Sequence, residues 1–177
     1  MMMMIIGVDP GKTGAAATIV DGELTAIWPF NGDIEICRSI GREARNYQPT
    51  YFIERVTASP HMGVVGAFTF GRWAEAVECT ARLTECEVHM VRPVVWQNTI
   101  GVFSAGDKAK LYDHAKNLFP VAFELKMFNK ATSDAVLIAY YGWRYMINKN
   151  GEPENGNENG ATTRRFYHNG RESTEEA

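Results

Sequence analysis

Three acidic residues stand where their types and spacing could do chemistry. Asp9 ends the apolar run 4–8 and is followed at once by a Pro-Gly turn, Glu54 ends a second apolar run at 51–53, and Asp134 opens a long apolar segment. A carboxylate at the tip of a buried strand is costly to bury unless a partner compensates it, and hard divalent cations bind carboxylate oxygens. Each acid taken alone is equally compatible with an ordinary turn or cap residue, so the expectation of a cation site rests on all three.

The three acids would meet if the strands that carry the first two are neighbours. Asp9 and Glu54 would then lie at the carboxyl end of the sheet, where ligands bind in open α/β folds, and a carboxylate at the start of a helix is stabilised by the helix dipole. Three clustered carboxylates repel one another unless a divalent cation lies between them. Oxygen-only ligation favours Mg²⁺, with Mn²⁺ as a substitute, over Zn²⁺. Two such ions about 4 Å apart can activate water for phosphodiester hydrolysis.

The elements that must position these acids alternate between strands and helices. Pro49, Pro93 and the Asp21-Gly22 turn separate the segments. Strands are predicted at 4–8, 15–20, 23–28, 50–56 and 87–91, helices at 33–46, 65–83, 107–118 and 132–147, and a short helical turn at 94–100, whereas 121–125 is ambiguous. This order predicts an α/β fold with a five-stranded mixed sheet flanked by helices.

The length of 177 residues predicts one domain, at 1–147, followed by a polar tail at 148–177 that is expected to be disordered. The apolar runs are far shorter than the ~20 residues of a membrane span, so no membrane partner is expected. Three cysteines, an odd number without metal-ligand spacing, indicate a reducing compartment and a cytoplasmic location, and Cys79 is expected in the core.

The net charge of −3 is not typical of a nucleic-acid-binding protein. The charge is uneven, however. The tail has four basic residues against six glutamates, and 108–130 contains five lysines against two acids. A cationic groove on a nearly neutral body is therefore compatible with the composition.

Four segments together resemble the RuvC family of Holliday-junction resolvases: 7–14 (GVDPGKTG), 54–59 (ERVTAS), 70–72 (FGR) and 133–139 (SDAVLIA). The sequence PVVWQ at 93–97, followed by the lysine-bearing helix, is most similar to the branch of this family found in bacteriophages. The resemblance runs from about residue 5 to about 142. It implies a ribonuclease H-like fold, a homodimer, and Mg²⁺-dependent cutting of four-way DNA junctions by paired nicks, with Asp9, Glu54 and Asp134 as metal ligands.

The sequence departs from the family where a fourth acid or a histidine usually precedes the last aspartate by three to five residues. Here Asn129, Lys130 and Ala131 occupy those positions. Asn129 could offer an oxygen to a metal, and Lys130 could contact the scissile phosphate or assist a water molecule. A second departure follows Glu54, where some members carry an aromatic that wedges into the junction. This chain has Thr57 there, so junction opening would fall to loop residues such as His61 or be weaker.

Six basic side chains are expected to contact DNA. Lys108 and Lys110 open a helix, where a cation opposes the dipole, and placement against a phosphate would explain this. A solvated face or a surface ion pair is the alternative for each of them. The expected contacts are Lys12, Arg55, His61, Arg72, Lys108 and Lys110.

Among the aromatic residues, Phe68, Phe70 and Trp73 could line a DNA groove or a dimer interface, but core packing is expected for at least two of them. Trp96 and His89 are expected to be structural.

Three functions compete with junction resolution. One is a broader nuclease of the same fold that cuts flaps or other branched DNA, and another is a junction-binding protein that has lost its chemistry with the fourth ligand. The retention of three acids argues against the second. The sequence DPGKTG also resembles the phosphate loop of actin-like ATPases, but those proteins need two such domains, and this chain supplies one.

Overall fold

A mixed β-sheet forms the centre of the molecule. The computed structural model describes residues 2–55, 57, 62–120, 127–151 and 162–163. The strands are β1 (Met4–Asp9), β2 (Ala15–Val20), β3 (Glu23–Pro29), β4 (Thr50–Glu54), β5 (Val88–Val91) and β6 (Thr162–Thr163). Their order across the sheet is β3-β2-β1-β4-β5-β6.

The first three strands form an antiparallel meander, and β1, β4 and β5 pair in parallel. Asp21 and Gly22 turn the chain between β2 and β3 with φ values of 47° and 92°, as a two-residue Asp-Gly hairpin requires. All five predicted strands form, and the predicted mixed sheet is confirmed. The sixth strand, β6, adds antiparallel to β5. It lies in the segment predicted to be disordered, whose remaining residues after 151 lie outside the described part of the chain.

Five helices cover the sheet, close to the predicted positions. They are α1 (Glu35–Tyr47), α2 (Val64–Leu83), α3 (Pro93–Thr99), α4 (Lys108–Leu118) and α5 (Ser133–Gly151). Helix α5 continues four residues past its predicted end, and the ambiguous segment 121–125 lies outside the described residues. None of the described helices is long and apolar enough to cross a lipid bilayer.

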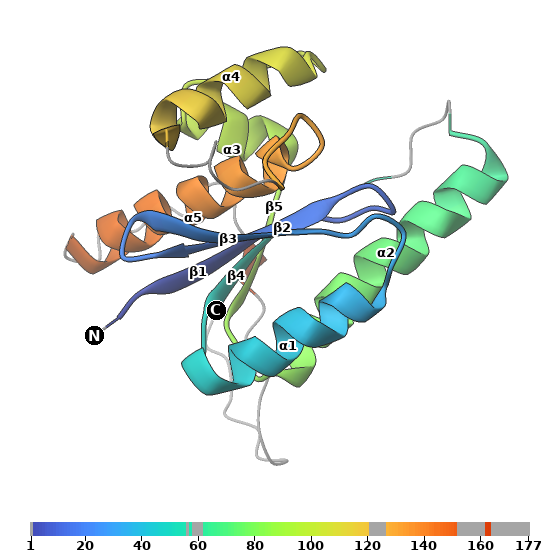
Figure 1. The fold of residues 1–177 in the computed structure, drawn as a ribbon, viewed down its shortest axis with the longest axis horizontal. Coiled ribbons are helices and arrows are strands. Elements are labelled where there is room, and N and C mark those ends of the chain that lie inside the picture. Colours follow the sequence, from blue (N-terminus) through green and yellow to red (C-terminus); the bar gives the residue numbers. More distant parts are fainter. Residues whose placement is uncertain (1, 56, 58–61, 121–126, 152–161, 164–177) are drawn as a thin grey trace, which may run out of the picture.

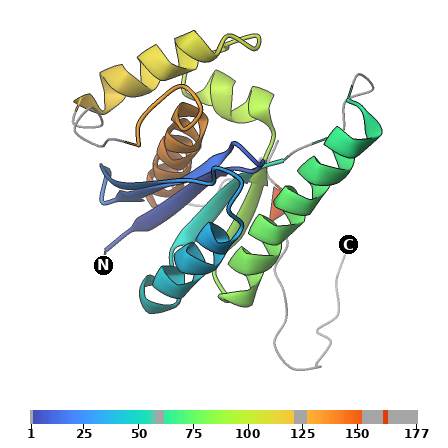
Figure 2. The ribbon, with the colours of Figure 1, turned by 45° about the vertical axis from the view of Figure 1, so that its right-hand side comes forward.

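The two faces of the sheet carry separate cores because successive side chains of a strand point to opposite faces. Ile5 and Phe52 belong to the core under α3, α4 and α5, whereas Ile6, Val8 and Ile53 belong to the core under α1 and α2. Figures 1 and 2 show these two helical layers on opposite sides of the sheet. Asp9 lies four residues after Ile5 on β1, and Glu54 lies two residues after Phe52 on β4, so each shares a face of the sheet with that residue. They are therefore directed to the face that α5 covers.

Helix α5 lies directly on the sheet backbone. A Cβ atom added to Gly7 would lie 2.1 Å from the backbone nitrogen of Ala139 and 2.6 Å from the carbonyl oxygen of Ala135. One added to Gly142 would lie 2.4 Å from Cδ2 of Phe52. Only glycine permits such an approach of helix to strand. The contact fixes the first turn of α5 beside the end of β1.

The structural roles expected for Trp96 and His89 agree with their full burial. The expectation that at least two of Phe68, Phe70 and Trp73 pack in the core is wrong: Trp73 is buried, but Phe70 is only half-buried and Phe68 is 69% exposed. One cysteine prediction is also wrong. Cys79 is exposed. It lies on the outward side of α2, whose inner side carries Trp73, Val77 and Ala81.

Candidate active site

Two of the predicted acids end neighbouring parallel strands. Val8 of β1 lies opposite Ile53 of β4, so Asp9 and Glu54 follow side by side at the carboxyl end of the sheet. Asp134 is the second residue of α5 and is 6% exposed. The sheet and the helix that rests on it thus bring the three acids to one edge.

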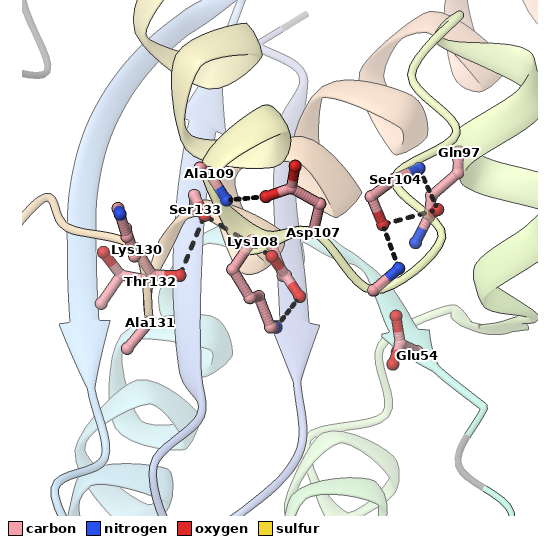
Figure 3. A network of polar contacts seen from close by, with 12 residues as sticks. Glu54, Gln97, Ser104, Asp107, Lys108, Ala109, Lys130, Ala131, Thr132 and Ser133 are labelled. Atoms are coloured by element: carbon pink, nitrogen blue, oxygen red, sulfur yellow. Dashed lines mark hydrogen bonds and ion pairs between the residues drawn. The ribbon is translucent and has the colours of Figure 1, made fainter.

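Lys108, the first residue of α4, supplies positive charge to this cluster. Its ammonium group forms an ion pair with the carboxylate of Asp134, as Figure 3 shows. The Asp107 carboxylate accepts the N–H of Ala109 at 2.9 Å and so caps the helix. Burial lowers the pKa of Lys108, but the hydrogen bond and charge of Asp134, with the charges of Asp9 and Glu54, outweigh burial and raise that pKa. Lys108 is therefore a fixed cation within the electrostatic range of all three acids.

Glu54 is held by a buried indole. Nε1 of Trp96, a fully buried residue of α3, donates a hydrogen bond of 2.9 Å to Oε2 of Glu54. Burial raises the pKa of Glu54, as does the charge of Asp134, while the Trp96 hydrogen bond and the charge of Lys108 oppose the rise. The indole fixes the orientation of the carboxylate and favours its ionised form.

Asp9 has a strongly raised pKa. Burial and the charges of Glu54 and Asp134 raise the pKa of Asp9 from 3.8 to about 7, and Lys108 only partly opposes this rise. The cluster has more negative charge than Lys108 can balance, so near neutral pH it either takes up a proton or gains from a second cation.

The donor set suits a hard cation in chemical type, because all three acids offer oxygen. Within the described residues, however, no three His, Cys, Asp or Glu side chains lie close enough together to hold a metal ion as they stand. Asp134 instead pairs with the ammonium group of Lys108 and accepts a long hydrogen bond of 3.5 Å from the Ser133 hydroxyl.

The residues that the sequence places before Asp134 have other contacts. Oδ1 of Asn129 accepts the N–H of Ala131 at 2.8 Å, and Nδ2 of Asn129 donates to the carbonyl oxygen of Met127 at 3.3 Å. Asn129 thereby stabilises the turn that leads into α5, and its role as a metal ligand remains a prediction. Lys130 is exposed.

The other basic residues are solvent-exposed. Lys12 lies in the turn after β1, three residues beyond Asp9, Arg55 directly follows β4, and Lys110 lies on the first turn of α4. Arg72 is on the outward side of α2, which covers the opposite face of the sheet from α5. His61 lies outside the described residues. Of the predicted DNA contacts, the structure brings Lys108 into the acid cluster.

Two contacts of this site do not follow from the sequence. Trp96 was expected only to pack, and its bond to Glu54 joins residues 42 positions apart without any local signal. The ion pair between Lys108 and Asp134 had a partial signal, because a lysine at the start of a helix needs an anion nearby. From the sequence, the anion expected beside Lys108 was a DNA phosphate. In the structure, the anion that pairs with Lys108 is the carboxylate of Asp134.

The chain is similar to known proteins in fold and not in sequence. No known family's sequence model matches the chain, and no curated protein matches it. A solved structure of RuvC from T. thermophilus in complex with a Holliday junction substrate is 16% identical, with a TM-score of 0.57, over 83% of this chain and 96% of that chain. A second Thermus thermophilus RuvC structure is 15% identical with a TM-score of 0.57, over 83% of this chain and 97% of that chain. The phage-type branch remains a prediction. The chain has the ribonuclease H-like fold of RuvC.

Proposed function

We propose that this protein is a metal-dependent endonuclease that resolves four-way DNA junctions by paired hydrolytic nicks. The observation that carries the proposal is the meeting of Asp9, Glu54 and Asp134 at one sheet edge, where their repulsion and burial raise the pKa of Asp9 to about 7. A purely structural cluster would have no use for such a concentration of negative charge. The similarity in fold to RuvC with a Holliday junction substrate supports the same activity.

The cofactor we propose is Mg²⁺, with Mn²⁺ as a substitute. Its ligands would be Asp9, Glu54 and Asp134, together with the amide oxygen of Asn129 if that side chain leaves its turn. When bound, such an ion supplies the positive charge that activates water and stabilises the leaving oxygen in phosphodiester hydrolysis.

The chain's own residues prepare the site for this reaction. The Trp96 indole orients Glu54 and favours its ionised form. A metal at Asp134 would compete with Lys108 for its charge, and a released ammonium group would become available to a phosphate oxygen. Lys130, exposed just before α5, can contact the scissile phosphate or assist the attacking water.

DNA would approach across the edge where the strands end. Lys12 and Arg55 follow the strands that end in Asp9 and Glu54, and Lys110 is exposed on the first turn of α4, so these cations would contact DNA that lies along this edge. Arg72, on α2, would contact DNA farther from the acids, and His61 is proposed as a further DNA contact. Neutralising several phosphates in this way releases counterions, so binding should weaken steeply with salt.

The protein is proposed to act as a homodimer in the cytoplasm. Helix α2 exposes an apolar surface formed by Val64, Val65 and Phe68, which are 87%, 81% and 69% exposed. A groove beside it contains Arg72 and Glu75, a pair of opposite charges that a two-fold related copy could match. We refer to these five residues as the α2 surface. The free thiols of all three cysteines agree with a reducing compartment.

The proposal is tested by incubating the full chain with a labelled synthetic four-way junction, a flap and a linear duplex, in Mg²⁺, Mn²⁺ or EDTA. Symmetric paired nicks on the junction are expected, and EDTA or Asp9→Asn should abolish them. Equal cutting of flaps would identify a broader branched-DNA nuclease with the same active site. Tight junction binding without nicks in either metal would identify a binding protein and refute the catalytic proposal.

A further inference from the structure

A hollow of about 350 Å³ opens beside the acid cluster. Glu54, Lys108 and Asp134 form one side of it, and Gln97, Phe103 and Ser104 form another. The volume lies in the range of sites that take one small ligand group, roughly 300–1,000 Å³. Whatever group enters the hollow must therefore be attached to, or lie next to, the group on which the acids act.

Phe103 provides an exposed aromatic ring at this hollow. It is 60% exposed, whereas its neighbours Val102 and Ser104 are 9% and 3% exposed. The N–H of Val102 donates to the carbonyl oxygen of Gln97 at 2.9 Å, so the loop is tied to α3 immediately before the ring. An exposed aromatic on an anchored loop has no role in the core of this chain. It suits a face on which a planar group can stack.

Gln97 provides a polar group of fixed orientation. Its Oε1 accepts the backbone N–H of Ser104 at 3.2 Å and the hydroxyl of Ser104 at 3.3 Å, and the Ser104 hydroxyl in turn accepts the N–H of Gly106 at 3.2 Å. A backbone N–H can only donate, so the amide oxygen is assigned without ambiguity. Figure 3 shows this network on the same side of Lys108 as Glu54. The amide NH₂ is left to offer hydrogen-bond donors to the hollow.

We infer that this hollow receives one unstacked nucleobase of the branched DNA, next to the scissile phosphate, and that Gln97 and Phe103 set a sequence preference. The inference rests on the proposed function. Phe103 stacks on the base, and the Gln97 NH₂ donates to acceptors on its edge. Guanine presents two adjacent acceptors, N7 and O6, and thymine presents O4, whereas adenine and cytosine carry an amino donor beside their acceptors and would set that donor against the Gln97 NH₂. The hollow therefore selects keto bases, guanine and thymine, over amino bases.

The continuity of the hollow with the acids argues for this occupant. Three of its lining residues are the two acids and the lysine that would contact a phosphate, so a base that enters it belongs to the nucleotide at the reacting position or an adjacent one. A base freed from its stack at a branch point is available at less cost than one in an intact duplex.

The inference is tested with a pool of four-way junctions whose bases around the branch point are randomised, by sequencing both the nicked products and the junctions that bind in EDTA. Wild-type protein should enrich guanine and thymine about tenfold at one position beside the nick. Gln97→Glu keeps an acceptor for Ser104 but presents acceptors to the hollow, so it should reverse the preference toward adenine and cytosine. Asn98→Ala, a change in the adjacent exposed amide that does not line the hollow, should leave the preference as in wild type.

Phe103→Ala should lower binding of the pool roughly 5- to 100-fold through the loss of one stacked base, and Phe103→Trp should restore it. Tyr47→Ala, which removes an exposed aromatic of α1, is the matched control and should bind as wild type does. Thermal melts establish that each variant is folded.

The outcomes separate this inference from the proposed function. Nicks with no base preference, or a preference that Gln97→Glu leaves unchanged, would overturn the inference while the nuclease stands. If no substrate is nicked, the proposed function fails. The base composition of the junctions bound in EDTA then still decides whether the hollow binds guanine and thymine in preference to adenine and cytosine.

Discussion

At the scale of single residues, the cluster of Asp9, Glu54 and Asp134 has more negative charge than Lys108 balances. Burial and mutual repulsion raise the pKa of Asp9 to about 7, and the same effects raise the pKa of Glu54. Energy stored in this repulsion is available to a cation that enters the cluster, so the stability of the protein should respond to pH, to mutation of the cluster and to divalent metal.

Asp9→Asn should stabilise the protein at pH 8 and have little effect near pH 4. The folded state raises the pKa of Asp9 above its unfolded value of 3.8. The folded protein therefore binds the Asp9 proton more tightly than the unfolded chain does. The free energy of unfolding that this proton contributes is lost as the pH rises toward about 7. Removing the charge should recover roughly 1–3 kcal/mol of the free energy of unfolding at pH 8. Urea unfolding at both pH values measures this, with the exposed Asp113→Asn as control. An effect of Asp9→Asn that is equal at both values would contradict it.

Lys108→Met should destabilise the metal-free protein by about 1–2 kcal/mol, because it leaves the nearly buried Asp134 without its cation. Half of the lysine side chain is exposed, which limits the loss. Millimolar MgCl₂ should raise the melting temperature of this variant more than that of the wild type, since the metal no longer competes with the ammonium group. Lys110→Met, on the same turn, is the control for stability. An equal response of both variants to Mg²⁺ would argue against metal at Asp134.

At the scale of elements, the position of Asp134 depends on how closely α5 approaches β1. Gly7 allows the backbone of α5 to contact the backbone of β1, and Gly142 leaves room for the ring of Phe52 on β4. The distance between Asp9 on β1 and Asp134 on α5 is therefore set by direct contact between the backbones of these two elements. Such a contact has no long side chain that could adjust to a change in packing.

Gly7→Ala should separate α5 from β1 and lower both stability and nicking. The added methyl group would meet the backbone of Ala135 and Ala139, which cannot move independently of the helix. We expect a loss of about 1–3 kcal/mol in the free energy of unfolding, as for other overpacked cores. Gly63→Ala is the control, because no heavy atom lies within 4 Å of its added Cβ. A folded Gly7→Ala protein of wild-type activity would show that the acids tolerate displacement of the helix.

At the scale of the whole molecule, one face is left incomplete. The inner side of α2 packs on the sheet through Trp73 and Val77, while the α2 surface leaves large apolar side chains in water. Contiguous exposed apolar surface on a soluble protein typically marks an interface. A two-fold dimer would also place two acid clusters in one particle, as paired nicking requires.

Phe68→Glu should convert a dimer into a folded monomer, because a charge in a desolvated interface is costly. Sedimentation at micromolar concentration measures the mass, and circular dichroism measures the fold. On junctions, the monomer should produce single, unpaired nicks. Leu83→Glu, at the other end of α2 and outside the α2 surface, should remain dimeric. A wild-type chain that is monomeric at all concentrations would refute the dimer.

The sequence predicts those parts of the fold and site that depend on local pattern. Asp9 and Glu54 were identifiable because each ends an apolar strand, and the helix of Asp134 because its apolar residues recur. Contacts between distant segments were not identifiable. The indole of Trp96 reaches Glu54 only after α3 packs on the same face of the sheet as α5. Lys108 reaches Asp134 only across the contact between α4 and α5. Strand β6 consists of two threonines whose pairing depends on the free edge of β5.

The order of the acids along the chain also bears on when activity can arise during synthesis. The first two acids leave the ribosome within the first third of the chain, but the third arrives with α5, the last helix described. At about 5–20 residues per second, several seconds separate them. A partly translated chain would lack both the third acid and the helix that packs on the strand of the first. A nascent or truncated product would then be unable to cut DNA, so that activity appears only in chains extended far enough for α5 to dock.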